Sequence, residues 1–449
     1  MKSKYRIRFL LVSSTLIVLM AGFIKPVDRT HFLDTSYYHK AQEKLDSLKN
    51  HSSTSQPSQL EAGWAKTNIT PDYATPLSGY GSRKGALSTG VHDSLWARGF
   101  IFKNHDEKIA FVTLDALLIP PTVTYQLMKR LPSIGYDIHH VYLTATHTHC
   151  SVGAWGTSWI GEKFAGDFDQ KIVNQLASSI LDVILQAEKN LEPARIGYAE
   201  YDAPELVTNR LVGKDGIIDP WFRVVKIQKK SGSSALLTTF AAHATCLSEE
   251  EYRFSRDYPG ALVDSLEALE NIEFAAFAAG GVGSHRSESG GYGQFDRINW
   301  LASSLTKKVH HESINLKEIS RMKMVLMAIP LREAHWRFSE NWRFRPWVFK
   351  WFIEDSPQYI TAFRIGNIVF SGTPCDFSGE LIPEIKNGIP ANDIHLIVTS
   401  FNGGYVGYIT KDCWYDMKGY ETFIMNWYGP YNGQYFVNMI RKIVNIIIA

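Results

Sequence analysis

The chain has 449 residues, 45% of them apolar, which is enough to bury a sizeable core. Its formal net charge is +2, so it carries no strong basic excess. This balance gives no reason to expect a nucleic-acid partner.

The N-terminus has the order of an export signal. Basic residues lie at positions 2, 4, 6 and 8, and an apolar run follows over residues 9–24. The run has about 16 residues, fewer than the roughly 20 that span a bilayer comfortably. We expect residues 1–24 to form a signal or anchor segment, either retained in the membrane or cleaved, and the remainder to lie outside the cytoplasm. A buried core helix is the alternative, although the flanking charges fit it poorly.

Residues 25–60 are rich in polar and charged side chains, and they include the polar run HSSTSQPS at 51–58. Such a composition buries little apolar area. We therefore expect a spacer, either a tether or a loosely packed helix.

Strand and helix patterns alternate from residue 61 to residue 449. Short apolar runs bounded by turn residues predict buried strands, the clearest at 109–114, 141–144, 222–227, 274–277 and 396–398. Apolar residues recur at three- and four-residue steps over 172–187 and 436–447, which predicts two amphipathic helices. We expect one large α/β domain over 61–449, with mixed β-sheets flanked by helices.

Two of the predicted strands end in histidines. The stretch 144–150 reads TATHTHC. Residues two apart in extended backbone face the same side, so we expect His147 and His149 to converge. Two neutral imidazoles suit Zn²⁺, although structural histidines are common. His243 ends another apolar strand, where it is either a ligand or a core histidine bonded to the backbone.

Two later segments carry an acid and several phenols. The stretch 368–377 reads IVFSGTPCDF, and it delivers Asp376 into the loop after an apolar strand, as a ligand or as a capping residue. The stretches 403–410 (GGYVGYIT) and 418–421 (KGYE) place tyrosines among glycines. Their phenols point into a cleft or are half-buried packing residues with a wet hydroxyl.

Residues 335–352 interleave Trp and Phe with Arg and Lys. That composition is typical of a surface seated at a membrane interface. Stacking of arginine on aromatic rings within the protein is the alternative.

Taken in order, these motifs resemble the neutral/alkaline ceramidases, over residues 62–430. That family has a GTHTHSGP-like segment, a strand ending in a lone histidine, a GDVSPN-like loop, a PGEF-like segment and a tyrosine-rich stretch. Here the similar positions are 145–151, His243, 280–285 (GGVGSH), 374–377 (PCDF) and 405–420. In addition, 90–101 is similar to the family's GIHTRLRARAFI, and 209–210 to the start of its NRSP.

The resemblance implies a catalytic domain that uses Zn²⁺ to hydrolyse the amide bond of an N-acyl lipid, ceramide, to a sphingoid base and a fatty acid. The zinc ligands that it implies are His147, His243, Asp376 and Tyr408. It also implies that His149 acts as a proton-transfer or transition-state partner, that Tyr420 points at the substrate carbonyl, and that Arg210 belongs to the site. A zinc hydrolase of another amide or ester, and a non-catalytic lipid-binding relative, are the alternative functions.

The sequence departs from the family pattern in three places. Asp376 stands where the family has a glutamate, so the backbone must approach the metal more closely, and Glu380 is the second choice of ligand. The loop 280–285 has lost its acid, and Ser284 is a displaced candidate for the family's serine. Its glycines either aim N–H groups at an oxyanion or serve a tight turn that needs φ > 0. The family usually carries a further β-rich domain after the catalytic segment, and we expect none here.

Overall fold

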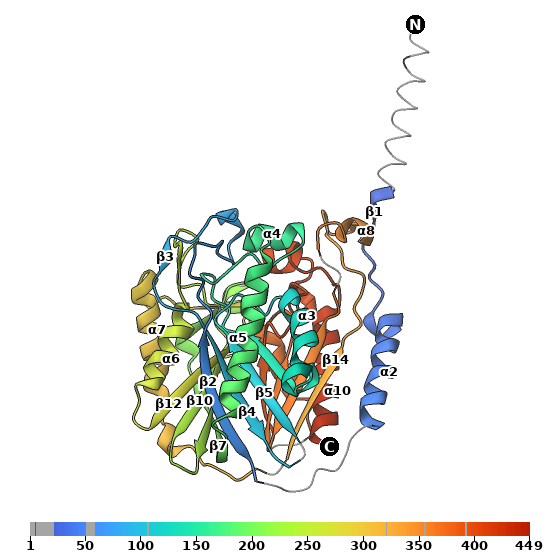
Figure 1. Cartoon of the computed structure of the whole chain (residues 1–449). Helices are drawn as coiled ribbons and strands as arrows, with labels where there is room; N and C mark the ends of the chain where they lie inside the picture. The colour runs from blue at the N-terminus through green and yellow to red at the C-terminus, as the bar shows by residue number, and fades with distance from the viewer. Residues whose placement is uncertain are drawn as a thin grey trace.

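Two β-sheets lie face to face at the centre of the molecule, as the computed structural model in Figure 1 shows. The structure describes residues 5, 22–50, 59–105, 107–319, 321–353, 356–390 and 393–449. The expected signal or anchor segment, residues 1–24, lies almost wholly outside these ranges. Among the residues that are described, no helix combines the length and the apolar character needed to cross a bilayer.

The larger sheet has eight strands of mixed direction. In spatial order they are β12 (Ile272–Ala279), β10 (Ser234–Phe240), β9 (Trp221–Lys229), β7 (Glu192–Asp202), β2 (Glu61–Asn68), β4 (Trp96–Lys103), β5 (Lys108–Leu114) and β6 (Val141–Ala145). The pairs β5–β6 and β10–β12 are parallel. The junction of β2 with β7 is only two residue pairs long, so the sheet opens into two halves there. The end strands β12 and β6 also approach each other. The Thr113 hydroxyl on β5, next to β6, donates to the carbonyl oxygen of Phe277 on β12 at 2.7 Å.

The smaller sheet has four strands, β14 (Met322–Ala328), β16 (Tyr359–Ile365), β17 (Ile368–Gly372) and β19 (His395–Thr399), in that order. Aromatic side chains fill the space between the sheets. Phe111 stacks on Tyr142 with ring centroids 4.7 Å apart, and it meets Phe370 of the smaller sheet at 5.1 Å. Side chains alternate along a strand, so the next residue, Val112, faces the opposite core. Strands buried on both faces explain the continuous apolar runs in the sequence.

Helices cover the outer face of each sheet, which confirms the predicted class of mixed sheets flanked by helices. The larger sheet is covered by α3 (Pro121–Arg130), α5 (Gln170–Glu188), α6 (Asp257–Glu267) and α7 (Gln294–Lys308). The smaller sheet is covered by α2 (Ser36–Asn50), α9 (Ile382–Lys386) and α10 (Asn432–Ile448). The amphipathic helices predicted at 172–187 and 436–447 are α5 and α10 (Figure 1).

The structure differs from the expected spacer at α2. This helix packs against α10 and contributes Ala41 and Leu45, at most 1% exposed, to the core of the smaller sheet. The Lys442 ammonium of α10 also donates to the Tyr38 hydroxyl at 3.1 Å. The average composition of residues 25–60 does not predict that α2 docks in the core. A helix that is polar on average still has an apolar face when its apolar residues recur at four-residue spacing. The polar run at 51–58 lies outside the described residues.

Four short pairs of strands complete the described fold. They are β1 (Ile24–Pro26) with β15 (Trp342–Phe344), β3 (Gly90–Val91) with β11 (Arg253–Phe254), β8 (Val207–Asn209) with β13 (His285–Ser287), and β18 (Asp376–Phe377) with β20 (Tyr408–Ile409). The pair β18–β20 is parallel and sets Asp376 opposite Tyr408.

Ser400, just after β19, ties several strand ends together. Its N–H donates to the carbonyl of Ala279 at the end of β12 at 3.0 Å, and its hydroxyl donates to the carbonyl of Gly280 at 2.7 Å. The Thr144 hydroxyl of β6 in turn donates to the Ser400 carbonyl at 3.1 Å. The carboxyl ends of β6, β12 and β19 therefore meet at one place, where loops have room to hold polar side chains.

Candidate metal centre and pocket

Three histidines converge where these strands end. His147 and His149 follow β6, and His243 follows β10. The Nε2 atoms of His147 and His243 are 2.9 Å apart, and those of His149 and His147 are 3.2 Å apart. All three residues offer ligand atoms within 4.8 Å of one another, which is the spacing of a metal site.

The reason for this convergence is not the strand alternation predicted from the sequence. Strand β6 ends at Ala145, and His147 lies in the left-handed region with φ +64°. Its N–H donates to the carbonyl of Ala116 at 3.0 Å, and its ring stacks flat on Phe401 at 3.8 Å. Packing therefore holds an uncommon backbone conformation, as is often found at functional sites.

The hydrogen bonds of His147 and His243 fix how each imidazole is protonated. The Nδ1 atom of His147 lies 2.6 Å from the carbonyl oxygen of Leu117, and that of His243 lies 3.0 Å from the carbonyl oxygen of Val282. A carbonyl oxygen only accepts, so we assign the hydrogen of each ring to Nδ1. Both Nε2 atoms are then bare acceptors that face each other. Burial lowers the pKa of His147 to about 3 and that of His243 well below its ordinary value, so both rings are neutral at physiological pH.

Asp376 turns one carboxylate oxygen toward these nitrogens. Its Oδ1 lies 3.6 Å from Nε2 of His147 and 3.4 Å from Nε2 of His243. This oxygen is buried and has no hydrogen-bond partner among the described residues. The other oxygen, Oδ2, accepts from the Tyr405 hydroxyl at 2.7 Å. Two bare nitrogens and an orphaned carboxylate oxygen directed at one point form a donor set that fits Zn²⁺.

Burial raises the pKa of Asp376 to about 7, while its hydrogen bond to Tyr405 and the Arg210 charge act in the opposite direction. Glu380, the second choice of ligand, makes other contacts. Its Oε1 accepts from the backbone N–H of Ile217 at 3.3 Å and from the Trp414 indole at 3.4 Å.

Tyr408 and Arg210 stand beside this group. The Tyr408 hydroxyl lies 3.5 Å from Nε2 of His243 and accepts from Nη2 of Arg210 at 2.9 Å. The Arg210 guanidinium also pairs with the Glu421 carboxylate at 2.8 Å. Burial raises the pKa of Tyr408 well above its ordinary value, and the Arg210 charge opposes that shift. Arg210 thus connects the Tyr408 phenol on β20 to the Glu421 carboxylate.

Tyr420 and His149 complete the polar end of the pocket. The Tyr420 ring lies 5.7 Å from that of Tyr408, nearly at right angles. Tyr420 is 43% exposed, and its partial burial raises the pKa of the phenol, which therefore keeps its proton at neutral pH. The Nδ1 atom of His149 is buried and has no hydrogen-bond partner among the described residues.

Ser284 lies apart from the pocket. Its hydroxyl pairs with that of Ser378, its side chain is fully buried, and it is not one of the residues that line the cavity. Its carbonyl oxygen accepts from the backbone N–H of Arg210 at 2.8 Å. The structure therefore connects Ser284 to the placement of Arg210.

The glycines of the loop 280–285 serve close packing. Gly281 and Gly283 are not among the residues with positive φ, and a Cβ at Gly283 would overlap the carbonyl oxygen of Asp376. Several N–H groups of the loop already have partners, since Gly280 donates to Phe240 and Gly283 to Phe377. At these positions the loop thus presents no N–H to an oxyanion. It contributes carbonyl oxygens that orient His243 and Arg210 instead.

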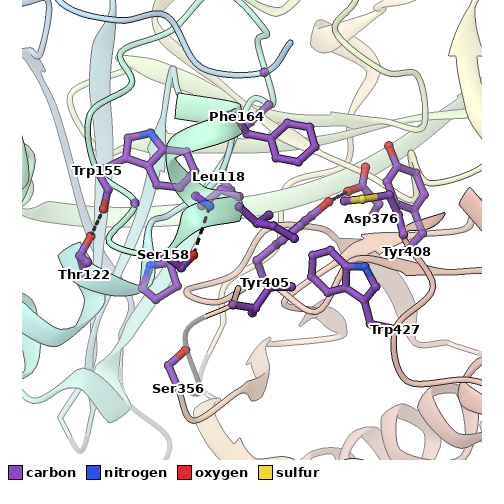
Figure 2. A pocket seen from close by; sticks show the side chains of 18 of the residues that line it. Leu118, Thr122, Trp155, Ser158, Phe164, Ser356, Asp376, Tyr405, Tyr408 and Trp427 are labelled. Atoms are coloured by element: carbon purple, nitrogen blue, oxygen red, sulfur yellow. Dashed lines mark hydrogen bonds between the residues drawn. The ribbon is translucent and has the colours of Figure 1, made fainter. Parts of the chain in front are cut away.

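One pocket is lined by His147, His149, Asp376, Tyr408 and Tyr420. Figure 2 shows Asp376 and Tyr408 at one side and Trp155 and Ser158 at the other. Apolar side chains make up much of the remaining wall, among them Leu117, Leu118, Trp155, Ile160, Phe164, Ile353, Met425 and Trp427. A mostly apolar cavity with a few polar groups at one end suits a long apolar ligand that has one polar centre.

Sequence reasoning missed the residues that support this site. Tyr405 lies within the tyrosine-rich stretch, but only the β18–β20 pairing reveals that it reaches Asp376. Leu117 and Val282 act through carbonyl oxygens, which leave no mark in the sequence. Glu421 follows Tyr420 directly and was overlooked as the partner of Arg210.

The sequence of this chain is similar to those of known ceramidases. The family described as neutral/alkaline non-lysosomal ceramidase, N-terminal, matches residues 60–283, about half of the chain. A neutral ceramidase of Pseudomonas aeruginosa is 26% identical over 216 residues, which are 44% of this chain and 32% of that protein. Neutral ceramidase A of Dictyostelium discoideum is 25% identical over 236 residues, which are 48% of this chain and 32% of that protein.

The fold is also that of a solved ceramidase. The crystal structure of neutral ceramidase from Pseudomonas aeruginosa superposes with a TM-score of 0.74 at 20% identity, covering 86% of this chain and 75% of that chain. A structure described as ceramidase complexed with C2 superposes with a TM-score of 0.73. The molecule is therefore an α/β protein of the ceramidase fold with a histidine-rich candidate metal centre. The chain belongs to the neutral/alkaline non-lysosomal ceramidase family. The matched sequence spans 32% of the length of these two curated relatives.

Proposed function

We propose that the protein is a zinc-dependent hydrolase that cleaves the amide bond of an N-acyl lipid, converting ceramide to a sphingoid base and a fatty acid. The observation that carries this proposal is the convergence of two bare imidazole nitrogens and an unpartnered carboxylate oxygen at one end of an apolar pocket. The family membership and the names of the relatives support the same substrate class.

In this proposal, His147, His243, Asp376 and Tyr408 hold Zn²⁺. The bound ion would act as a Lewis acid and lower the pKa of water toward neutrality. His149 also lies within reach of the group and is the alternative to Tyr408 as a ligand.

The remaining polar residues act on the amide. The protonated phenol of Tyr420 donates a hydrogen bond to the carbonyl oxygen as negative charge develops there. The neutral imidazole of His149 takes a proton from the attacking water and passes it to the nitrogen as the C–N bond breaks, because an amine leaves poorly without that proton. Arg210 holds the Tyr408 hydroxyl and is itself held by Glu421, which keeps the phenol in place.

The proposed domain, location and membrane surface rest on the sequence. We propose that residues 61–449 form the catalytic domain, that residues 1–24 direct it out of the cytoplasm as a signal or an anchor, and that it works at a membrane surface. A lipid with two long chains resides in membranes rather than in water, so its hydrolase must meet it there.

A matched set of substrates tests the proposal. The full chain is incubated with a long-chain ceramide, the corresponding acyl ester and a short water-soluble acyl amide, and both products are measured by mass spectrometry. We expect ceramide to give the highest kcat/KM, because its chains fill the apolar pocket. Preferred cleavage of the ester or the short amide would indicate another hydrolase, and binding of ceramide without either product would indicate a non-catalytic lipid-binding protein.

A further inference from the structure

The elements β1, α4 (Trp159–Ala165) and α8 (Pro346–Phe349) lie at one end of the molecule (Figure 1). Exposed large aromatic side chains occur on these elements and on residues near them. We name this surface the aromatic crest, and it consists of Phe23, Trp159, Phe338, Trp342, Trp347 and Trp351, which are between 39% and 64% exposed. Trp347 contacts two other members, with ring centroids 5.0 Å from Phe23 and 4.7 Å from Trp351. Several exposed large aromatic residues in contact mark an interaction surface rather than ordinary exposure.

The stretch 335–352 divides between the two interpretations that its sequence allows. Arg337 is buried and lies over the Tyr415 ring at 3.5 Å, and Arg343 is buried at 1% exposure. These residues show the arginine–aromatic packing within the protein. Trp342, Trp347 and Trp351 point their exposed rings outward instead. Within this stretch, the exposed tryptophans are therefore the residues that could contact a membrane interface.

Two segments contribute residues both to the crest and to the wall of the pocket. Trp159 is followed directly by Ile160, which lines the pocket. The ring centroid of Trp159 lies 5.4 Å from that of Phe352. The backbone N–H of Ile160 donates to the carbonyl of Phe352 at 3.1 Å, and the next residue, Ile353, again lines the pocket. Whatever covers the crest therefore lies next to the apolar wall of the cavity.

We infer that the crest is seated in the interfacial region of a lipid bilayer, so that the pocket receives its ligand from the membrane. Tryptophan prefers this region, because its ring is apolar and its N–H is polar. The chain itself favours this occupant over a protein partner. The sequence of residues 9–24 is an apolar run that includes Phe23, and Phe23 packs on Trp347 of the crest. The inference rests on the proposed function in one respect, namely that the substrate is a membrane lipid.

Spin labelling of the full chain tests this placement without any measurement of turnover. With the exposed Cys413 changed to Ser, the variants Trp351→Cys and Trp342→Cys are each labelled with a nitroxide. Tyr292→Cys is the matched control, because Tyr292 is 50% exposed and lies beside α7, away from the crest. Collision of the label with oxygen and with water-soluble chromium oxalate is measured with and without phosphatidylcholine vesicles.

We expect vesicles to raise the oxygen collision rate and to lower the oxalate collision rate several-fold at positions 351 and 342, and to leave position 292 unchanged. Equal oxalate access at all three positions in vesicle-bound protein would overturn the inference, as would a failure of the protein to bind vesicles. A protein that shows the expected depths yet hydrolyses no ceramide would refute the proposed function and not the membrane placement.

Discussion

The two oxygens of Asp376 have different environments, and this difference defines the site at the scale of single residues. Oδ2 is bound by the Tyr405 hydroxyl, while Oδ1 is left for the histidine nitrogens. A fixed second oxygen keeps the short carboxylate oriented, which matters more for aspartate here than for a longer glutamate. Tyr405 is thus a positioning residue for the proposed ligand.

Tyr405→Phe removes this hydrogen bond and should weaken zinc binding about 10- to 100-fold, as loss of an outer partner of a metal ligand generally does. Competition with a chromophoric chelator measures the affinity. Tyr73→Phe is the matched control, since its hydroxyl bonds to the Asp169 carboxylate on the surface at 3.1 Å. Equal zinc affinity in the two variants would argue against the positioning role.

Ser284 and Tyr420 are expected to differ in role. Ser284 supports the structure, whereas Tyr420 faces the substrate. We expect Tyr420→Phe to lower kcat about 100- to 1,000-fold, because the carbonyl oxygen loses its donor. Ser284→Ala should leave kcat within a few-fold of the wild type and cost about 1 kcal/mol of stability through its lost bond to Ser378. A large loss of kcat in Ser284→Ala, with zinc content unchanged, would assign the serine to the chemistry.

At the scale of elements, helix α2 shows how local pattern outweighs composition. Its Leu45 is 1% exposed within the core that α10 closes. We expect Leu45→Ala to lower the free energy of unfolding by about 2 to 4 kcal/mol, because it leaves a cavity. Urea unfolding measures the change, and the exposed neighbour Lys44→Ala provides the control. If Leu45→Ala unfolds at the wild-type midpoint, α2 is not docked in solution.

The elements also show what the sequence could reveal. Strands such as β5 and β12 were predictable because burial on both faces leaves an unbroken apolar run. His147, His243 and Asp376 were predictable because each follows such a strand. The backbone turn at His147, with φ +64°, was not, since it depends on Phe401, more than 250 residues away. The carbonyl contacts of Leu117 and Val282 were hidden for a similar reason: any residue has a carbonyl.

At the scale of the whole molecule, buried neutral histidines should make the fold sensitive to acid. His335 is 1% exposed, and burial together with the Arg343 charge lowers its pKa to about 3. The unfolded chain takes up this proton near its ordinary pKa of about 6.5. The stabilising contribution of neutral His335 is therefore present above about pH 6.5 and is lost progressively as the pH falls toward about 3, by at most about 1.4 kcal/mol per pH unit.

His335→Gln should therefore flatten the fall in unfolding free energy between about pH 6.5 and pH 4, by up to that slope. Urea unfolding of metal-free protein across this range gives the comparison, so that loss of metal at low pH does not contribute. Parallel pH profiles for the variant and the wild type would show that His335 is not held neutral in the fold.

We propose that the residues around His147 and His243 bind a zinc ion on which amide hydrolysis depends. The most direct test measures zinc content and ceramide turnover on the same preparations, for the wild type before and after chelation, after zinc is restored, and for His243→Ala. We expect zinc and turnover to be lost together on chelation, to return together when zinc is restored, and to be absent in His243→Ala. Full turnover by metal-free protein, or undiminished zinc in His243→Ala, would contradict it.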